Sequence, residues 1–186
     1  VTVPGSLHIG SGSTGSVVGN IVTNGFVYFG RSTGNTYTYN GSISGSGGVV
    51  IAGGGTIVLG ASNSYTGSTN LQVGILAVSS NAALGAPSST LYFQVGSGTL
   101  RTDASLGTIT QNITVEDSAK GIDTNGFETT LAGVISGQGG IRKQGAGTLT
   151  LTGINTYSGG TTVSAGTLLA WISTRRGSPK QIGDQD

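Results

Sequence analysis

The chain has 186 residues, no cysteine, a formal net charge of +1 and charged side chains at only 8% of its positions. The absence of cysteine excludes disulfides and thiol chemistry, and the sparse charge leaves no basic patch of the kind that binds nucleic acid. Glycine accounts for 36 residues, well above its usual share of about 7%.

Short stretches in which valine, isoleucine, leucine, threonine and tyrosine alternate with polar residues recur along the chain. A period of two is typical of β-strands that bury one face. In chain order we expect strands at residues 6–9, 16–22, 26–29, 36–39, 49–51, 56–59, 70–73, 75–78, 90–95, 99–101, 108–115, 128–131, 148–151, 161–163 and 167–172.

The same alternation predicts which side chains point into the core. Residues of equal parity within one strand share a face of the sheet. The expected inward pairs are Ile57 with Leu59, Leu71 with Val73, Leu76 with Val78, Leu149 with Leu151, and Val163 with Ala165.

Glycine-rich segments at residues 45–48, 53–55 and 137–140 separate the expected strands. Glycine adopts positive φ at little cost, so these segments predict tight corners. No segment favours a regular helix, because glycine, threonine, serine and asparagine have low helical propensity. The one candidate is residues 79–87, which we expect to make a single turn before Pro87.

The sequence repeats itself at an offset of 92 residues (145 − 53 = 92). The block GGGTIVLGASNSYTGSTNLQVGILA begins at Gly53, and GAGTLTLTGINTYSGGTTVSAGTLL begins at Gly145. Within both blocks a glycine-led strand returns after 19 residues (74 − 55 and 166 − 147). The matched positions form the repeat motif, which consists of Gly55, Thr56, Leu59, Asn63, Tyr65, Gly67 and Gly74 in the first copy and Gly147, Thr148, Leu151, Asn155, Tyr157, Gly159 and Gly166 in the second.

A spacing of about 20 residues suits one coil of a β-solenoid, in which successive coils pair in parallel. We therefore predict an all-β solenoid of about eight coils over residues 1–172. Residues 173–186 lose the alternation, and we expect a C-terminal tail that adds little to the core. Trp171 is expected to cover part of the last coil.

Residues 145–168 read GAGTLTLTGINTYSGGTTVSAGTL, and this pattern resembles the passenger-associated repeat of bacterial autotransporters. Residues 53–76 match the same pattern with departures at Ala61, Ser68 and Ile75. The resemblance implies a right-handed parallel β-helix that is secreted or displayed on a Gram-negative cell surface. It also implies a parent protein anchored through an outer-membrane β-barrel.

Adhesion, aggregation and biofilm formation are the roles that the resemblance implies for such a segment, as an adhesin stalk or binding surface. The implied partners are a host surface, a glycan or another copy of the same protein, with no nucleic acid and no cofactor. A purely structural spacer is the alternative within the same family.

Asparagine and tyrosine recur together at predicted corners, as Asn63 with Tyr65 and Asn155 with Tyr157. The functional interpretation is an aromatic platform for sugar or host ligands. The structural interpretation is that asparagine bonds the corner backbone while tyrosine packs over the adjacent coil. Recurrence in both copies favours the structural interpretation.

A second group of aromatic residues has no counterpart in the second copy: Phe26, Tyr28, Phe29, Tyr37 and Tyr39. Two interpretations stay open for it. The group either caps the N-terminal coil or contacts a ligand, and a ligand surface would consist of Tyr28, Tyr37 and Tyr39.

An enzyme is the alternative class, because many polysaccharide lyases and hydrolases are β-helices. Their chemistry needs paired carboxylates or calcium ligands. The one acidic grouping consists of Glu116, Asp117, Asp123 and Glu128, with Lys120 nearby and Asp103 within reach through coil stacking. We expect these carboxylates to lie on the surface and at corners without catalysis or metal binding.

Two further patterns have plain structural interpretations. GSGSTG at residues 10–15 is followed by an expected strand rather than a helix, so it predicts a corner and no dinucleotide site. His8 is the only histidine, and a lone histidine builds no zinc site. We therefore expect no catalytic, cofactor-binding or metal-binding residue.

Overall fold

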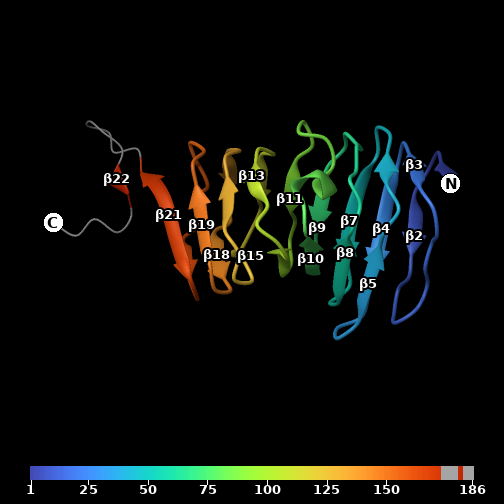
Figure 1. Cartoon of the computed structure of the whole chain (residues 1–186), viewed down its shortest axis with the longest axis horizontal. Coiled ribbons are helices and arrows are strands. Elements are labelled where there is room, and N and C mark those ends of the chain that lie inside the picture. The colour runs from blue at the N-terminus through green and yellow to red at the C-terminus, as the bar shows by residue number, and fades with distance from the viewer. Residues whose placement is uncertain (173–179, 182–186) are drawn as a thin grey trace.

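The computed structural model describes residues 1–172 and 180–181. The chain winds into coils that stack along one axis, with the first coil at one end of an elongated body and the last coil at the other (Figure 1). Strands of successive coils pair in parallel with continuous register. The all-β solenoid predicted from the repeats is confirmed.

Four sheets run along the body, and each is built from one strand of each successive coil. Sheet A contains β1 (Thr2–Val3), β3 (Ile21–Thr23) and β6 (Ile43–Ser44). Sheet B contains β2 (Leu7–Ile9), β4 (Phe26–Gly30), β7 (Gly48–Ala52), β9 (Thr69–Leu71), β11 (Leu91–Phe93), β14 (Ile113–Val115) and β17 (Ile135–Gly137). Sheet C contains β5 (Thr36–Tyr39), β8 (Thr56–Leu59), β10 (Gly74–Val78), β12 (Gly98–Thr102), β15 (Lys120–Asp123), β18 (Ile141–Gln144) and β20 (Thr161–Val163). Sheet D contains β13 (Gly107–Ile109), β16 (Thr129–Leu131), β19 (Thr148–Leu151), β21 (Thr167–Ile172) and β22 (Lys180–Gln181), the last of which pairs antiparallel with β21.

The early coils pass through sheets A, B and C in turn, whereas the later coils pass through D, B and C. Sheet D therefore takes the position of sheet A in the second half of the solenoid. A short 3-10 helix, η1 (Asn81–Leu84), lies between the end of sheet A and the start of sheet D, in the segment that joins β10 to β11. The Asn81 amide donates to the Thr108 carbonyl at 2.9 Å, which ties η1 to the start of sheet D. The single helical turn predicted before Pro87 is confirmed.

The core is a set of aliphatic rows that run along the inside of the sheets. In sheet C, Ile57, Leu76, Leu100 and Ile122 follow one another in register, and each is 0% exposed. Burying each such side chain contributes about 1.5–3 kcal/mol. The hydrophobic effect thus acts along the axis, from each coil to the next.

Most of the predicted inward residues are buried, but three differ from the prediction. Val73 is 37% exposed because β9 ends at Leu71, so the alternation does not continue to it. Val163 belongs to the inner row of sheet C but is 48% exposed in its last strand, and Ala165 is exposed beyond the end of β20.

Six of the described strands, β1, β6, β15, β17, β18 and β22, are not predicted from the sequence, and β1 and β22 are only two residues long. β6 and β17 are only two and three residues long. Such short strands show no detectable alternation of apolar and polar residues. β15 and β18 each contain a lysine that is buried, Lys120 at 1% and Lys143 at 0% exposed. A buried cation contradicts the usual pattern of apolar-in and polar-out.

Both lysines are buried because their ammonium groups reach backbone carbonyls at the corners. Lys143 takes the inner row of sheet C after Ile122, and its Nζ donates to the carbonyls of Gln144 at 2.8 Å, Gly145 at 2.7 Å and Ala165 at 3.1 Å. Lys120 donates to the Gly96 carbonyl at 2.6 Å and to the Asp117 carboxylate. Each lysine therefore joins neighbouring coils.

The pKa of Lys143 makes stability depend on alkaline pH. Burial lowers this pKa below the ordinary 10.5, while the negative charge of Asp123 partly offsets the shift. Between the lowered pKa and 10.5 the unfolded chain binds more protons than the folded chain, so the Lys143 contribution to stability rises with pH in that window. We expect the unfolding free energy of the wild type, relative to Lys143→Met, to increase between pH 8 and pH 10.

Urea unfolding of the two proteins at both pH values measures this difference, and tyrosine ionisation cancels because both chains contain the same tyrosines. A difference that stays constant with pH would show that Lys143 has an unshifted pKa.

Candidate functional site

The asparagine of the repeat motif bonds backbone groups of adjacent coils. Asn63 is buried; its Oδ1 accepts from the Ile43 N–H at 2.7 Å, and its Nδ2 donates to the Ala83 carbonyl at 2.7 Å. One side chain thereby connects three successive coils. Asn155 repeats half of this arrangement, since its Oδ1 accepts from the Ile135 N–H at 2.9 Å.

The tyrosine of the motif packs beside this asparagine. Tyr65 is 0% exposed, and its hydroxyl shares a 2.6 Å hydrogen bond with Thr69 Oγ1. Burial raises the pKa of Tyr65 well above the ordinary value. Tyr157 makes the same bond with Thr161 Oγ1 at 2.6 Å, but its ring is half-buried. These contacts give the motif a role in holding the coils together.

The two motif copies predict a sharp contrast between identical substitutions. Tyr65→Phe leaves the buried Thr69 hydroxyl without its partner, so we expect a loss of about 1–2 kcal/mol of unfolding free energy. Tyr157→Phe, in which water replaces the lost partner, should cost less than about 0.5 kcal/mol. Urea unfolding of both variants measures the two effects, and equal losses would contradict the difference in burial.

The two copies of the motif lie on different faces of the solenoid. In sheet C, Thr56 stands in register with Ile75, Thr99, Gly121 and Arg142, which takes four coils and 86 residues (142 − 56 = 86). Its repeat counterpart, Thr148, comes six residues later (148 − 142 = 6) and starts β19 in sheet D. The 92-residue offset therefore covers four complete coils plus the step from sheet C to the next sheet, sheet D. Equivalent residues of the two copies thus lie on different sheets and do not form one row that a ligand could contact.

Of the three tyrosines expected to form a ligand surface, Tyr39 is buried in the first coils, whereas Tyr37 and Tyr28 are half-buried. Tyr39 is 2% exposed, and its hydroxyl donates to the Gly19 carbonyl at 2.7 Å. The half-buried Tyr37 hydroxyl donates to the Val17 carbonyl at 3.2 Å, under the Arg31 guanidinium. Both rings pack beside Phe29, at centroid distances of 6.1 Å and 5.6 Å, and Tyr37 also lines an open hollow with Val17, so the ligand surface of Tyr28, Tyr37 and Tyr39 stays a prediction.

Tyr28 lies on the outer side of β4. Its ring stacks on the exposed His8 ring with a centroid distance of 4.3 Å and an interplanar angle of 4°. This pair is an exposed aromatic feature of sheet B, at the N-terminal end of the solenoid.

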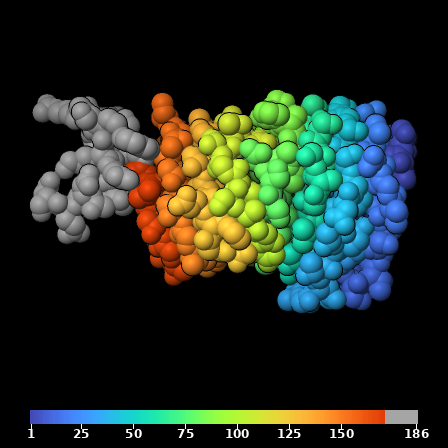
Figure 2. Space-filling model, viewed as in Figure 1, coloured from blue at the N-terminus to red at the C-terminus, as the bar shows by residue number. Residues whose placement is uncertain are grey.

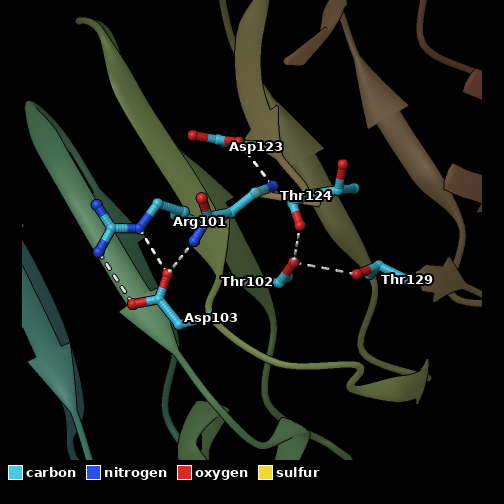
Figure 3. A network of polar contacts seen from close by, with 7 residues as sticks. Arg101, Thr102, Asp103, Asp123, Thr124 and Thr129 are labelled. Carbon is cyan, nitrogen blue, oxygen red and sulfur yellow. Dashed lines mark hydrogen bonds and ion pairs between the residues drawn. The ribbon is translucent and has the colours of Figure 1, made fainter. Parts of the chain in front are cut away.

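Coil stacking brings Asp103 close to the corner that contains Asp123, as the sequence suggests. The positively charged side chain of Arg101 lies at the same place and pairs with Asp103. Arg101 donates to both carboxylate oxygens of Asp103, at 2.7 Å and 2.9 Å, and Asn125 Nδ2 donates to Asp103 Oδ1 at 3.1 Å (Figure 3). Asp123 accepts from the Asn125 N–H at 2.9 Å. Beneath this surface network, the Thr102 hydroxyl bonds the Thr124 carbonyl and Thr129.

The other carboxylates in the described part of the chain do not converge with this pair. Glu116 accepts from the Tyr92 hydroxyl at the end of sheet B, Asp117 pairs with Lys120, and Glu128 is exposed. The hydrogen bond from Arg101 lowers the pKa of Asp103, and that from Lys120 lowers the pKa of Asp117. A general acid needs the opposite shift.

Residues 10–15 form the corner between β2 and β3, with positive φ at Gly10 and Gly15 and no helix after it. Within residues 1–172 and 180–181, no group of three or more histidine or acidic side chains is placed to hold a metal ion. None of the helices described is long and apolar enough to cross a membrane.

A cavity of about 320 Å³ opens beside η1, between the coil of Asn63 and the coil of Gln111. No sequence pattern predicts this cavity, because η1 interrupts the repeat and no motif marks the residues around it. The signal available in the sequence is the length of this coil: 24 residues separate Ile75 from its register partner Thr99 (99 − 75 = 24), against 19 between Thr56 and Ile75 (75 − 56 = 19).

A parallel solenoid whose repeated residues hold its own coils together defines the class of elongated, repeat-built β-solenoid proteins. The passenger-associated-transport-repeat family matches residues 50–78 and 141–170, which are the two copies of the motif. The chain therefore contains two passenger-associated transport repeats.

A curated relative is the adhesin BmaC autotransporter of Brucella suis biovar 1 (strain 1330), which is 37% identical over 105 residues. The match covers 55% of this chain and 3% of that protein, so the chain spans a small part of its relative's length. No solved structure shows a significant match.

Proposed function

We propose that this chain is a non-enzymatic, adhesin-like segment of an autotransporter passenger, which acts as a stiff stalk with lateral binding surfaces. The observation that supports this most is the continuous stack of coils that carries two passenger-associated repeats, together with the likeness to an autotransporter adhesin. Stacked coils with an unbroken core transmit force along the axis and hold surface groups at fixed positions.

The proposed location is the surface of a Gram-negative bacterium, either anchored through the outer membrane in the parent protein or released from it. The proposed partners are a host surface, a glycan or another copy of the chain. The low charge supports contacts made by hydrogen bonds and apolar groups rather than by long-range electrostatic steering.

Adhesion is tested with beads that carry the folded chain, placed on host epithelial cells and on a bacterial lawn under flow. We expect these beads to be retained more than beads that carry an equal density of albumin. Retention on bacteria but not on host cells would identify self-association or bacterial contact. Retention equal to albumin on both surfaces would leave the chain as a spacer and contradict the adhesin role.

The absence of enzymatic activity is tested separately, by incubating the chain with pectin-like and other polysaccharides and measuring new reducing ends. We expect no turnover, because the paired groups Arg101 with Asp103 and Lys120 with Asp117 leave no protonated general acid beside a free carboxylate. Turnover that disappears in Asp117→Ala or Asp123→Ala would establish an enzyme.

A further inference from the structure

The cavity beside η1 is a product of the lengthened coil. The chain leaves β10, turns through η1 and reaches β11 only after Pro87, so η1 stands between the coils of Asn63 and Gln111. The volume of about 320 Å³ is at the lower end of the range of about 300–1,000 Å³ for small-molecule sites. The cavity therefore accommodates a ligand of one ring.

One polar side chain in the cavity wall has no partner within the protein. Gln111 is 4% exposed, yet its carboxamide makes no hydrogen bond to the described part of the chain. The two asparagines beside it are engaged, since Asn63 bonds Ile43 and Ala83 and Asn81 donates to Thr108. The only buried polar side-chain atom without a partner in the described part is Asn70 Oδ1, so the Gln111 amide is open to the cavity, and a molecule in the cavity, water or ligand, completes its hydrogen bonds.

The cavity wall is uncharged and has two kinds of surface. Ala82, Ala86 and Pro87 supply an apolar patch, whereas Ser64, Thr110 and Gln111 supply groups that both donate and accept hydrogen bonds. An anionic or cationic ligand would lose its hydration here without gaining an opposite charge. A neutral ring that has an apolar face and a rim of hydroxyl groups matches both surfaces.

We propose that this cavity binds a single neutral sugar residue of a glycan, with the Gln111 carboxamide bonded to a ring hydroxyl or acetamido group. The proposal rests on the adhesin role and names its ligand class and its site. It also places the contact on a part of the chain that the motif does not repeat.

The test is an NMR titration of the full-length chain with glucose, galactose, mannose, N-acetylglucosamine and N-acetylgalactosamine, each added alone. We expect at least one sugar to shift the side-chain amide signal of Gln111 in a saturable way. Gln111→Ala should weaken that sugar about fivefold to tenfold, as the loss of one hydrogen bond implies. Ser64→Tyr, which places a ring at the exposed rim of the cavity, should weaken it as well.

The matched control is Gln138→Ala, which removes the same side chain from an exposed position on another face and should leave binding unchanged. Ser64→Tyr should keep the wild-type unfolding midpoint because Ser64 is exposed, whereas Gln111→Ala removes a side chain that is 4% exposed and should lower the midpoint without unfolding the chain. The proposal is overturned if no sugar in the panel shifts Gln111, or if Gln111→Ala and Ser64→Tyr bind as the wild type does.

The bead experiment separates this proposal from the adhesin role. Beads retained by cells equally well with Gln111→Ala would keep the adhesin role and reject the cavity as its contact site. A sugar that shifts Gln111 on a chain whose beads are not retained would keep the sugar site and reject adhesion.

Discussion

Gly137→Ala should lower the unfolding free energy of this protein by about 3 kcal/mol or more, because two separate costs coincide at one corner. Gly137 has φ +111, a region that alanine rarely adopts, and a Cβ there would overlap the Val115 carbonyl oxygen of the preceding coil. The backbone of the preceding coil lies directly against Gly137, so a local shift relieves neither the conformational nor the steric cost. Urea unfolding monitored by circular dichroism measures the loss.

Two matched variants separate the costs. Gly107→Ala changes a residue with φ +69 that has open space around its Cβ position, so it reports the conformational cost alone, about 1 kcal/mol. Gly139→Ala changes a residue outside the positive-φ region whose Cβ would overlap the Asp117 carbonyl, so it reports the steric cost alone. If Gly137→Ala costs no more than Gly107→Ala, the coils at this corner are not in the close contact described.

Leu100→Ala should cost about 3 kcal/mol, the middle of the range for a large-to-small change in a packed core. Leu100 is 0% exposed in the inner row of sheet C, between Leu76 and Ile122. Because each coil packs only on its neighbours, the cavity lies in the middle of the stack and weakens two interfaces at once. Thermal and urea unfolding both measure the effect.

Val163→Ala is the control, since Val163 belongs to the same inner row but is 48% exposed in the last strand of sheet C. It should cost less than about 1 kcal/mol. Similar costs at the two positions would indicate that the solenoid core extends beyond Val163 and covers it.

Local patterns in the sequence are sufficient to predict the architecture but not the orientation of its parts. Alternation of residues such as Ile57 and Leu59 predicts strands, and a return after 19 residues predicts coils, because both depend on neighbouring residues alone. The direction in which the second motif copy faces depends on every coil length between Thr56 and Thr148. The four coils from Thr56 to Arg142 take 86 residues, six fewer than the 92-residue offset, so the second copy lies one face further round.

The parts of the site that the sequence does not predict share a physical cause. No pattern in the sequence marks Lys143 as buried, because its stem lies in the core row while its charged ammonium reaches three corner carbonyls. Tyr39 is read as part of a ligand surface, but the open core of the first coils needs a large ring. Gln111 belongs to no motif, and its isolation appears only when η1 is placed beside it.

Residues 173–179 and 182–186 lie outside the described residues, so the tail and its separation from the solenoid at residue 172 stay predictions. The cap formed by Trp171 stays a prediction as well. In the described part, β22 (Lys180–Gln181) pairs antiparallel with the end of β21, which brings the chain back against its last solenoid strand.

Equivalent residues of the two repeat copies lie on different sheets, sheet C for the first copy and sheet D for the second. The copies therefore hold coils together and present no common surface. Paired spin labels measure this directly, because the chain has no native cysteine. Val58 and Gln144 lie in one outer column of sheet C, four coils apart, so labels at Val58→Cys and Gln144→Cys should be separated by about 19 Å along the axis. Labels at Val58→Cys and Thr150→Cys, the repeat counterparts, should give a longer mean distance because Thr150 lies on sheet D. A shorter distance for the 58 and 150 pair than for the 58 and 144 pair would place both copies on one face and contradict the account.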